Sequence, residues 1–377
     1  MIINAPSSTE IVFSRTASPI IVSSIENDAS LSVSIETDGP SIEFAPKLYN
    51  GVYTLPLSDL LKSLESDLSI PDTAPSGVFY FTPRKTTITF REISSLSAYP
   101  SDTKSCVIYW MPGYCRTRSN INSNLQNGRY WWTTRPQSCI TYRWSKEFLT
   151  IALSSGDSEP SKIHIYVDIH LRRTGKVSIL YKSLLTTKQT SLATIDCSYD
   201  KIESIAKENG YGDDDILAYD IYGSNGVSRD CPIGQRFIIA PNDRSIRAWI
   251  FRNSLGAFDT VYSSGELCRA IDSETRNFTT SGSEMELANI SKEVFTVNTG
   301  YIKSKGELNL WYEFLRSSER YILSADGNHH RIVVDSQDSK KVLDTAGSLS
   351  FQCRMSEEVF GYAEEKSVLD EWSDEFT

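Results

Sequence analysis

The sequence predicts a mainly β protein built of several antiparallel β-sandwich modules, of the immunoglobulin-like, fibronectin-like or tail type, with a few short helices. Alternating apolar and polar runs recur roughly every 8–15 residues and are separated by Gly, Asn and Asp turn signals, as in all-β folds. The aromatic content of 11%, with 19 Tyr, suits strands better than long helices. Only three short stretches place their apolar residues at helical spacing.

A chain of 377 residues is long enough for about two to four domains. The segment SIPDTAPSG (69–77) is rich in Pro, Ser and Gly and predicts a linker. We therefore expect an N-terminal β-sandwich module (1–72), a second β module (77–160), a third β module with a short helix (161–234), a C-terminal β module (235–355) and an acidic tail (356–377).

The first predicted elements are short. Residues 31–35 alternate before an Asp38–Gly39 turn, and Asn50–Gly51 lies between two strand-like runs, which predicts a hairpin. The stretch SDLLKSL (58–64) predicts a helix with Ser58 as its N-cap.

The clearest predicted hairpin runs from residue 162 to residue 185. Its apolar residues face one way and its polar residues the other, with Thr174–Gly175 in the connection. Residues 198–210 follow as a predicted short helix, which Ser198 begins and Gly210 ends.

The C-terminal third continues with strands and one helix. Alternation predicts a hairpin over residues 246–263, and apolar spacing predicts a helix over 306–318. A further hairpin over 320–336 turns at Asp326–Gly327, and residues 349–355 form a last predicted strand.

The hairpin 246–263 carries polar residues that could belong to an active site, but a structural role accounts for each of them. Trp249 is large enough to anchor the sheet on a core, and Gly256 can adopt the left-handed backbone of a turn. Asn253 can hydrogen-bond nearby backbone groups, and Asp259 can accept hydrogen bonds from loop N–H groups across the hairpin. We therefore interpret these four residues as parts that hold the hairpin together.

The segment RYWWTTRP (129–136) offers a candidate interaction site made of Tyr130, Trp131, Trp132 and Arg135. Adjacent residues of a strand point to opposite faces, so the two tryptophans cannot both enter one core. One of them needs a second surface, which favours an inter-domain or inter-subunit contact. The alternative is a platform that stacks on the sugar rings of a glycan, as in a carbohydrate-binding or receptor-recognition protein.

The net charge of −10 is concentrated at the C-terminus. Residues 356–377 contain eight carboxylates against Lys366, which leaves −3 for everything before them. Neither part has the basic surface expected of a protein that binds nucleic acid. Aromatic residues, among them Trp372, are interleaved with the acidic ones, so the tail is suited either to docking on a neighbour or to remaining solvated.

The sequence has no recognisable catalytic or cofactor motif. GxSxG, HExxH, P-loop and GxGxxG patterns are all missing, so we expect no enzyme and no cofactor. A pair of carboxylates that face each other in a cleft, as in a glycan hydrolase, remains an alternative because sequence does not give their separation.

Three groups of residues suggest a metal site, and each has a plainer interpretation as solvated strand or turn. They are His164, Asp168 and His170 on one strand face, the run Asp213 to Asp215 with Asp220, and the adjacent His329 and His330. The first lacks a further ligand, the second lacks the EF-hand spacing, and the third points to opposite faces of a strand. We therefore expect no metal.

The N-terminal residues lack the basic start and apolar core of a signal peptide, and no run has the length of a membrane-spanning helix. The seven cysteines are widely spaced with no CxxC pair, which is typical of reduced thiols. We therefore expect a protein that stays in the cytoplasm where it is made and does not insert in a membrane.

Several segments, WIFRNSLGAFDTVYSSGE (249–266) among them, resemble large proteins of phages and prophages from gut Bacteroidales. WIFRNSLGAFDTVYSSGE (249–266) is similar to their pattern F-x-x-x-N-S-L-G-G-[YF]-D-T-x-x-x-x-G-E, with Ala257 in place of the last Gly of the loop. The long acidic end is a second departure. Further similar segments are PIIVSSIENDASLSVSIE (19–36), YTLPLSDLLKSL (53–64), YWWTTRPQ (130–137), KEFLTIAL (146–153), LWYEFLRSSERYIL (310–323), HHRIVVDS (329–336) and LSFQCRM (349–355).

This resemblance implies a structural protein of the virion, associated with the phage tail as a baseplate or adaptor component and assembled in the host cytoplasm. Its partners would be copies of itself and other virion or tail proteins, and a glycan if the platform at Tyr130–Arg135 is exposed. The resemblance implies no catalytic residue.

Overall fold

A computed structural model describes residues 1–7, 11–24, 30–37, 41–65, 77–93, 102–115, 131–153, 162–186, 191–212, 214–224, 234–241, 243, 245–280, 283–324, 327–338 and 347–356. Within these ranges, 23 strands and three helices are present, and the strands form five sheets. The predicted mainly β fold with few helices is confirmed. Two strand pairs are parallel, namely β2 (Ile11–Phe13) with β9 (Asp102–Met111) and β10 (Ser138–Thr141) with β16 (Gln235–Ile239), and the other described strand pairs are antiparallel.

The N-terminal module consists of two sheets and one helix around a shared hydrophobic core. In the strand β4, Leu31, Val33 and Ile35 are buried and alternate with partly exposed residues, as predicted. The three-stranded sheet has the order β1 (Ile2–Asn4), β3 (Ile20–Ser23), β6 (Val52–Leu55), and the five-stranded sheet has the order β2 (Ile11–Phe13), β9 (Asp102–Met111), β8 (Arg84–Ile93), β4 (Ser30–Glu36), β5 (Ile42–Phe44).

Two local predictions in this module have different outcomes. Asn50 and Gly51 both have positive φ and connect Tyr49 to Val52, which pair across the turn. Ser58 is not the N-cap of the helix α1 (Leu57–Ser63), because Pro56 occupies that position. Proline lacks a backbone N–H and fixes its φ, so it suits the start of a helix. The Asp38–Gly39 turn lies outside the described residues, although its flanking strands β4 and β5 pair.

The strand pairing divides the chain differently from the expected module boundaries. β8 pairs with β4 and β9 pairs with β8, so β8 and β9 belong to the N-terminal module. β7 (Val78–Phe81) instead pairs with β14, which lies more than a hundred residues later. The strands of the expected module 77–160 are therefore divided among three sheets, because pairing joins strands whose distance in sequence leaves no local signal.

The middle module contains a three-stranded and a five-stranded sheet. Its predicted hairpin is present, with Ile165, Val167 and Ile169 buried and Gly175 at positive φ in the turn. Ser198 and Gly210 flank the helix α3 (Tyr199–Glu208) as predicted. The sheet orders are β11 (Phe148–Leu153), β14 (Ser191–Asp196), β7 and β10 (Ser138–Thr141), β16 (Gln235–Ile239), β15 (Ile216–Ser224), β12 (Lys162–Leu171), β13 (Gly175–Leu185).

The C-terminal module is a seven-stranded sheet with the helix α4 (Lys305–Arg316) packed against it. Trp249, Phe314 and Phe351 meet in the core, with ring centroids 5.3–5.9 Å apart. The predicted hairpins over 246–263 and 320–336 are both present. The strand order is β18 (Phe258–Ser263), β17 (Arg247–Arg252), β21 (Arg320–Leu323), β22 (His329–Asp338), β23 (Ser350–Met355), β20 (Ser283–Asn298), β19 (Leu267–Thr280).

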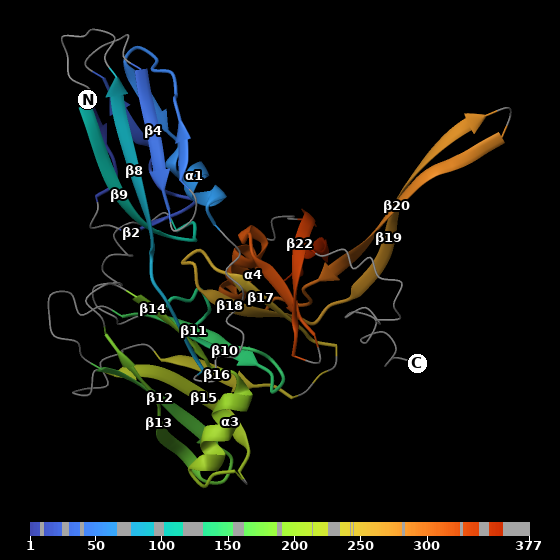
Figure 1. The fold of residues 1–377 in the computed structure, drawn as a ribbon. Helices are drawn as coiled ribbons and strands as arrows, with labels where there is room; N and C mark the ends of the chain where they lie inside the picture. Colours follow the sequence, from blue (N-terminus) through green and yellow to red (C-terminus); the bar gives the residue numbers. More distant parts are fainter. Residues whose placement is uncertain are drawn as a thin grey trace.

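A long two-stranded extension leaves this sheet at its β19 edge. β19 and β20 pair with each other from Leu267 to Thr280, but β20 pairs with β23 only over Phe295–Asn298. The remaining ribbon, residues 271–280 and 283–293, projects away from the body of the molecule, and we call it the arm (Figure 1).

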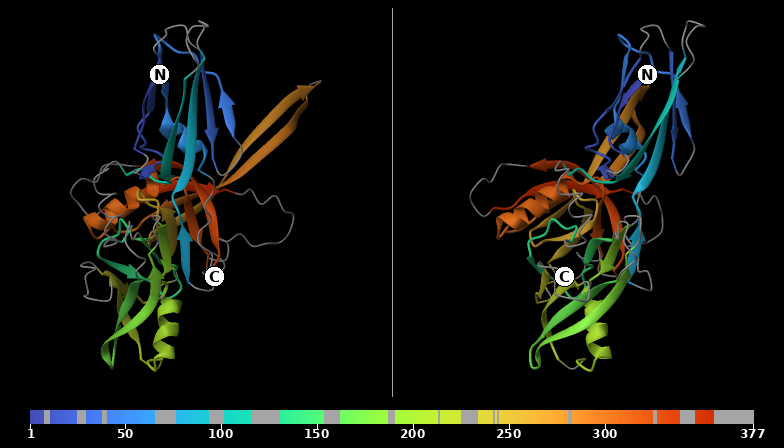
Figure 2. Two further views of the ribbon diagram at one scale, coloured as in Figure 1. Left: turned by 60° about the vertical axis from the view of Figure 1, so that its left-hand side comes forward. Right: turned by 90° about the vertical axis from the view of Figure 1, so that its left-hand side faces the viewer.

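The three modules lie in a different spatial order from their order in the sequence. The N-terminal module is at one end, the middle module is at the other, and the C-terminal sheet lies between them (Figures 1 and 2). Segments of all three modules meet near the loop between β17 and β18. No helix among the described residues is long and apolar enough to cross a membrane.

Candidate functional site

The loop between β17 and β18 is organised by Asn253, which is fully buried. Its Oδ1 accepts hydrogen bonds from the backbone N–H groups of Leu255 and Ala257, at 3.0 and 3.1 Å. Its Nδ2 donates to Asp259 at 2.8 Å and to the carbonyl of Trp132 at 3.1 Å. Asn253 therefore shapes its own turn, as predicted, and also ties that turn to the middle module.

The same loop contacts the N-terminal module through its backbone. The carbonyl of Ser254 accepts from the N–H groups of Tyr114 at 3.0 Å and Cys115 at 3.1 Å. Gly256 has a φ of +82°, and a Cβ at this position would lie 2.2 Å from the carbonyl oxygen of Pro112. Glycine is required here both for the turn and for this close approach.

Glu313 on α4 connects the loop between β17 and β18 to the segment that follows β9. Its carboxylate accepts from the Ser254 N–H at 2.8 Å and from the Tyr114 hydroxyl at 2.8 Å. Burial and the adjacent Glu313 charge raise the pKa of Tyr114, so this phenol stays protonated and remains a donor.

Asp259 lies at the start of β18 and is fully buried. Besides Asn253, it accepts hydrogen bonds from the Thr133 hydroxyl at 2.6 Å, the Thr134 N–H at 2.9 Å and the Thr134 hydroxyl at 3.1 Å. The sequence predicted that its partners would be N–H groups of its own loop. The structure corrects this, because the carboxylate instead holds the segment that follows Trp132.

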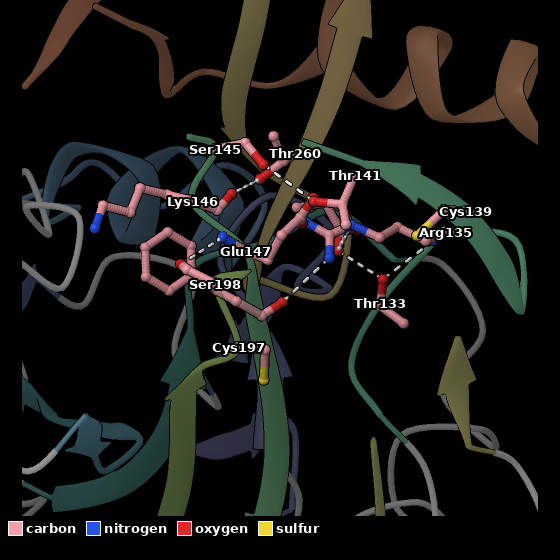
Figure 3. Close-up of polar contacts among 12 residues, drawn as sticks. Thr133, Arg135, Cys139, Thr141, Ser145, Lys146, Glu147, Cys197, Ser198 and Thr260 are labelled. Atoms are coloured by element: carbon pink, nitrogen blue, oxygen red, sulfur yellow. Dashed lines mark hydrogen bonds and ion pairs between the residues drawn. The ribbon is translucent and has the colours of Figure 1, made fainter. Parts of the chain in front are cut away.

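Arg135 is the central cation of this junction, with its side chain only 1% exposed (Figure 3). Its Nη2 lies 2.8 Å from Oε2 of Glu147, and its Nε lies 3.4 Å from Oδ1 of Asp259. The other oxygen of Glu147 accepts from the hydroxyls of Thr141, at 2.8 Å, and Tyr262. We call Arg135, Glu147 and Asp259 the buried ion cluster.

The charges of the buried ion cluster do not balance if all three groups are ionised. Burial raises the pKa of Glu147, and the nearby Asp259 adds to this, although Arg135 and the hydroxyls of Tyr262 and Thr141 act against it. Burial works against the Arg135 guanidinium, but Glu147 and Asp259 raise its pKa, so it stays charged. Removing one member would leave an uncompensated charge in a dry site.

The two adjacent tryptophans enter different cores. Trp131 packs in the middle module and is 8% exposed. Trp132 is 3% exposed and packs with Phe13, Met111 and Ala257, which come from the N-terminal and C-terminal modules. Trp132 is therefore the tryptophan that packs on a second surface, and that surface lies between modules. Tyr130 and Trp372 lie outside the described residues.

This burial contradicts the alternative of an exposed stacking platform. Trp131, Trp132 and Arg135 are covered by the chain itself, so they cannot receive a sugar ring. Glu147 and Asp259 are likewise enclosed around one guanidinium, and neither faces a cleft that a glycan could enter. Together the groups at the junction hold three modules in one arrangement.

The candidate metal residues of the middle module have separate partners. His164 bonds Ser183 at 2.8 Å, whereas His170 bonds Asp220 at 2.9 Å. Asp168, expected on a solvated face, is buried, and Lys176, Ser178 and Tyr222 surround its carboxylate. No group of three or more potential ligands is found in the part of the chain that the structure describes.

The remaining candidate metal ligands contact other protein groups. Asp214 accepts from the backbone N–H groups of Arg173 and Thr174 and so caps the turn between β12 and β13. Asp213 lies outside the described residues. His329 and His330 both lie on β22, and His329 packs edge-on against Tyr321 at 5.5 Å.

Sequence reasoning missed Glu147, Thr141, Tyr262 and Glu313. One signal was present for Glu147, because a charged residue opens the apolar run EFLTIAL of a buried strand. No local pattern pairs it with Arg135 or with Tyr262. In comparisons with known proteins, no family model matches the chain and no curated protein matches it significantly.

Proposed function

We propose that this chain is a structural component of a phage or phage-like tail, such as a baseplate or adaptor protein, and acts through protein–protein assembly. The observation that carries this proposal is how the polar residues are used. The ionisable and polar groups of the junction are buried and connect the modules. Among the described strands, the edge of β13 and the arm have no further strand paired with them.

The resemblance of residues 249–266 to phage and prophage proteins supports the same function. That segment forms β17, β18 and the loop between them, where the three modules meet. A component of a tail has to present its contact surfaces in a fixed arrangement, and a buried junction with many hydrogen bonds between modules favours one arrangement of modules over others.

The test is to locate the protein in particles. The gene would be expressed with an internal epitope tag in a host that produces the phage, and particles would be separated from soluble protein on a density gradient. We expect the protein to co-sediment with intact tails and to occupy density in a reconstruction of the particle. Tails that assemble normally without it, with all of the protein in the soluble fraction, would contradict the proposal.

A further inference from the structure

The described part of the chain has two long open strand edges. One is β13, an 11-residue strand at the edge of the five-stranded sheet of the middle module. The other is the arm, formed by the 14-residue β19 and the outer part of β20. The other edge strands of the described sheets have three to six residues, too few to pair with a strand of this length.

The β13 edge has the features of a surface that accepts a strand. It pairs only with β12 and leaves its other backbone edge open. Leu180 and Leu185 are 49% and 57% exposed. A long edge strand with exposed apolar residues readily pairs with another chain. Its basic residues are Lys176, which pairs with Asp168 on β12, and Lys182, and it contains no carboxylate.

The arm has the features of the complementary element. Its ten paired positions, from Ile271 opposite Glu293 to Thr280 opposite Ser283, join only its own two strands. A two-stranded ribbon is marginally stable in water, so a ribbon of this length gains from a third strand. Residues 271–293 contain five carboxylates and two basic residues, which gives the arm a net negative charge opposite to that of β13.

We propose that the arm of one copy pairs with the β13 edge of a second copy of this chain and extends its five-stranded sheet. This inference rests on the proposed function in assembly and names the contact. Main-chain hydrogen bonds would supply the affinity, and the opposite charges and exposed leucines would supply the specificity. Each copy offers one arm and one edge, so the contact is head-to-tail and builds a ring or a filament.

Two variants separate the two halves of the contact. In the armless variant, Asn-Gly replaces residues 272–292 and closes a two-residue hairpin between the paired Ile271 and Glu293. In the edge variant, Leu180→Glu and Leu185→Glu place like charges opposite the acidic arm. The matched control, Leu180→Gln with Leu185→Gln, changes the same positions without adding charge.

Sedimentation velocity measures the outcome. We expect the wild type to form oligomers that grow with concentration, and each variant alone to be monomeric. An equimolar mixture of the two variants should form a 1:1 dimer, because the armless chain still offers its edge and the edge variant still offers its arm. The Glu pair should weaken association by at least about tenfold relative to the Gln pair.

Other results would overturn this contact. Association of the armless variant alone would indicate edge-to-edge pairing, and association of the edge variant alone would indicate arm-to-arm pairing. A wild type that stays monomeric to about 100 μM would exclude the contact as an assembly interface. If that monomer still co-sediments with tails, only this inference fails and the proposed function stands.

Folding of the variants is checked by far-UV circular dichroism. Should the armless chain fail to fold, Thr275→Pro with Asn289→Pro provides a second way to disrupt the arm, since these residues pair within it. This double variant should behave as the armless chain does in the mixing experiment, and oligomers of wild-type size would again contradict the contact.

Discussion

The hairpin β17–β18 and the hairpin β19–β20 occupy the two opposite edges of one seven-stranded sheet. In the first, all the residues of β17 are buried and the loop is covered by two other modules. In the second, the strands are more than twice as long, and the outer part pairs only with itself. The sheet thus has a hairpin at each edge, and one is buried inside the molecule whereas the other projects away from it.

The difference shows that a polar residue contributes to holding modules together only where other modules pack against it. Asn253 and Asp259 hydrogen-bond to each other and to the surrounding backbone, and these bonds help to fix how the three modules meet. The arm is also rich in polar residues, but its ribbon projects away from the other modules (Figure 1). Stability should therefore be very sensitive to the first hairpin and nearly indifferent to the second.

The largest effect is expected from Arg135→Met, which leaves two buried carboxylates without their cation. Breaking a buried ion pair from one side typically costs about 3–5 kcal/mol. Urea unfolding followed by tryptophan fluorescence measures the loss. Arg236→Met is the matched control, because the Arg236 side chain is 48% exposed beside Asp220, and its loss should cost less than about 1 kcal/mol. Equal losses for the two variants would contradict the role of the cluster.

Gly256→Ala should come second. The residue needs positive φ, and the new Cβ would meet the Pro112 carbonyl at 2.2 Å, so we expect a loss of about 2–4 kcal/mol. Gly175→Ala isolates the backbone effect. Gly175 has a φ of +84° with nothing within 4 Å of the added Cβ, so it should lose only about 1–2 kcal/mol. A Gly256 variant no less stable than the Gly175 variant would show that the loop is not tightly held.

The third effect is a dependence on pH. Burial raises the folded-state pKa of Glu147 above its usual 4.5, so between pH 4.5 and that raised pKa the folded protein holds a proton that the unfolded chain has released. The free energy of unfolding therefore falls as pH rises through this window, by at most about 1.4 kcal/mol per pH unit. Glu147→Gln removes this term, so unfolding measured at several pH values should show the wild type losing stability relative to the variant.

Asp214 provides a control of opposite sign. Desolvation acts against its charged form, but the N–H groups of Arg173 and Thr174 lower its pKa to about 2. Its contribution is present above the usual value of 3.8 and is lost as pH falls toward 2. Asp214→Asn should therefore remove the loss of stability between about pH 4 and pH 2 and leave the slope of stability against pH above 4.5 unchanged.

The smallest effect is expected from the largest change. Replacing residues 272–292 with Asn-Gly removes the arm, yet the free energy of unfolding should change by less than about 1 kcal/mol, because the removed strands pair only with each other. Calorimetry of the armless chain checks this. A loss as large as that of Gly256→Ala would mean that the arm supports the C-terminal sheet and would end the contrast between the two hairpins.

Local patterns predicted the elements whose two faces differ in burial. Residues 162–185 alternate clearly because a core lies on one side of that hairpin, and the hairpin is present. The hairpin over 246–263 is present as well, although β17 is buried on both faces. The strands of the arm went unpredicted. Apolar and polar residues alternate only weakly along residues 271–293, so the sequence gives little strand signal there although the strands are long.

The junction could be predicted only in part. The need for a second surface beside Trp131 follows from strand geometry, and Trp132 meets that need between modules. The pairing of Arg135 with Glu147 and Asp259 could not be read from the sequence, because Asp259 lies 124 residues from Arg135 and comes from another sheet. Strand pairing crosses the expected boundary at 72–77, because β7 and β8 are neighbours in sequence but pair with strands of different modules.

The placement of β7 has a mechanical consequence. The backbone enters the middle module at β7, returns to the N-terminal module at β8 within two residues, and leaves it again after β9. Three covalent passages therefore connect these modules where a simple tether would supply one. A torque applied to either module is shared among the three connections. The two modules should therefore rotate together as one rigid unit rather than twist relative to each other.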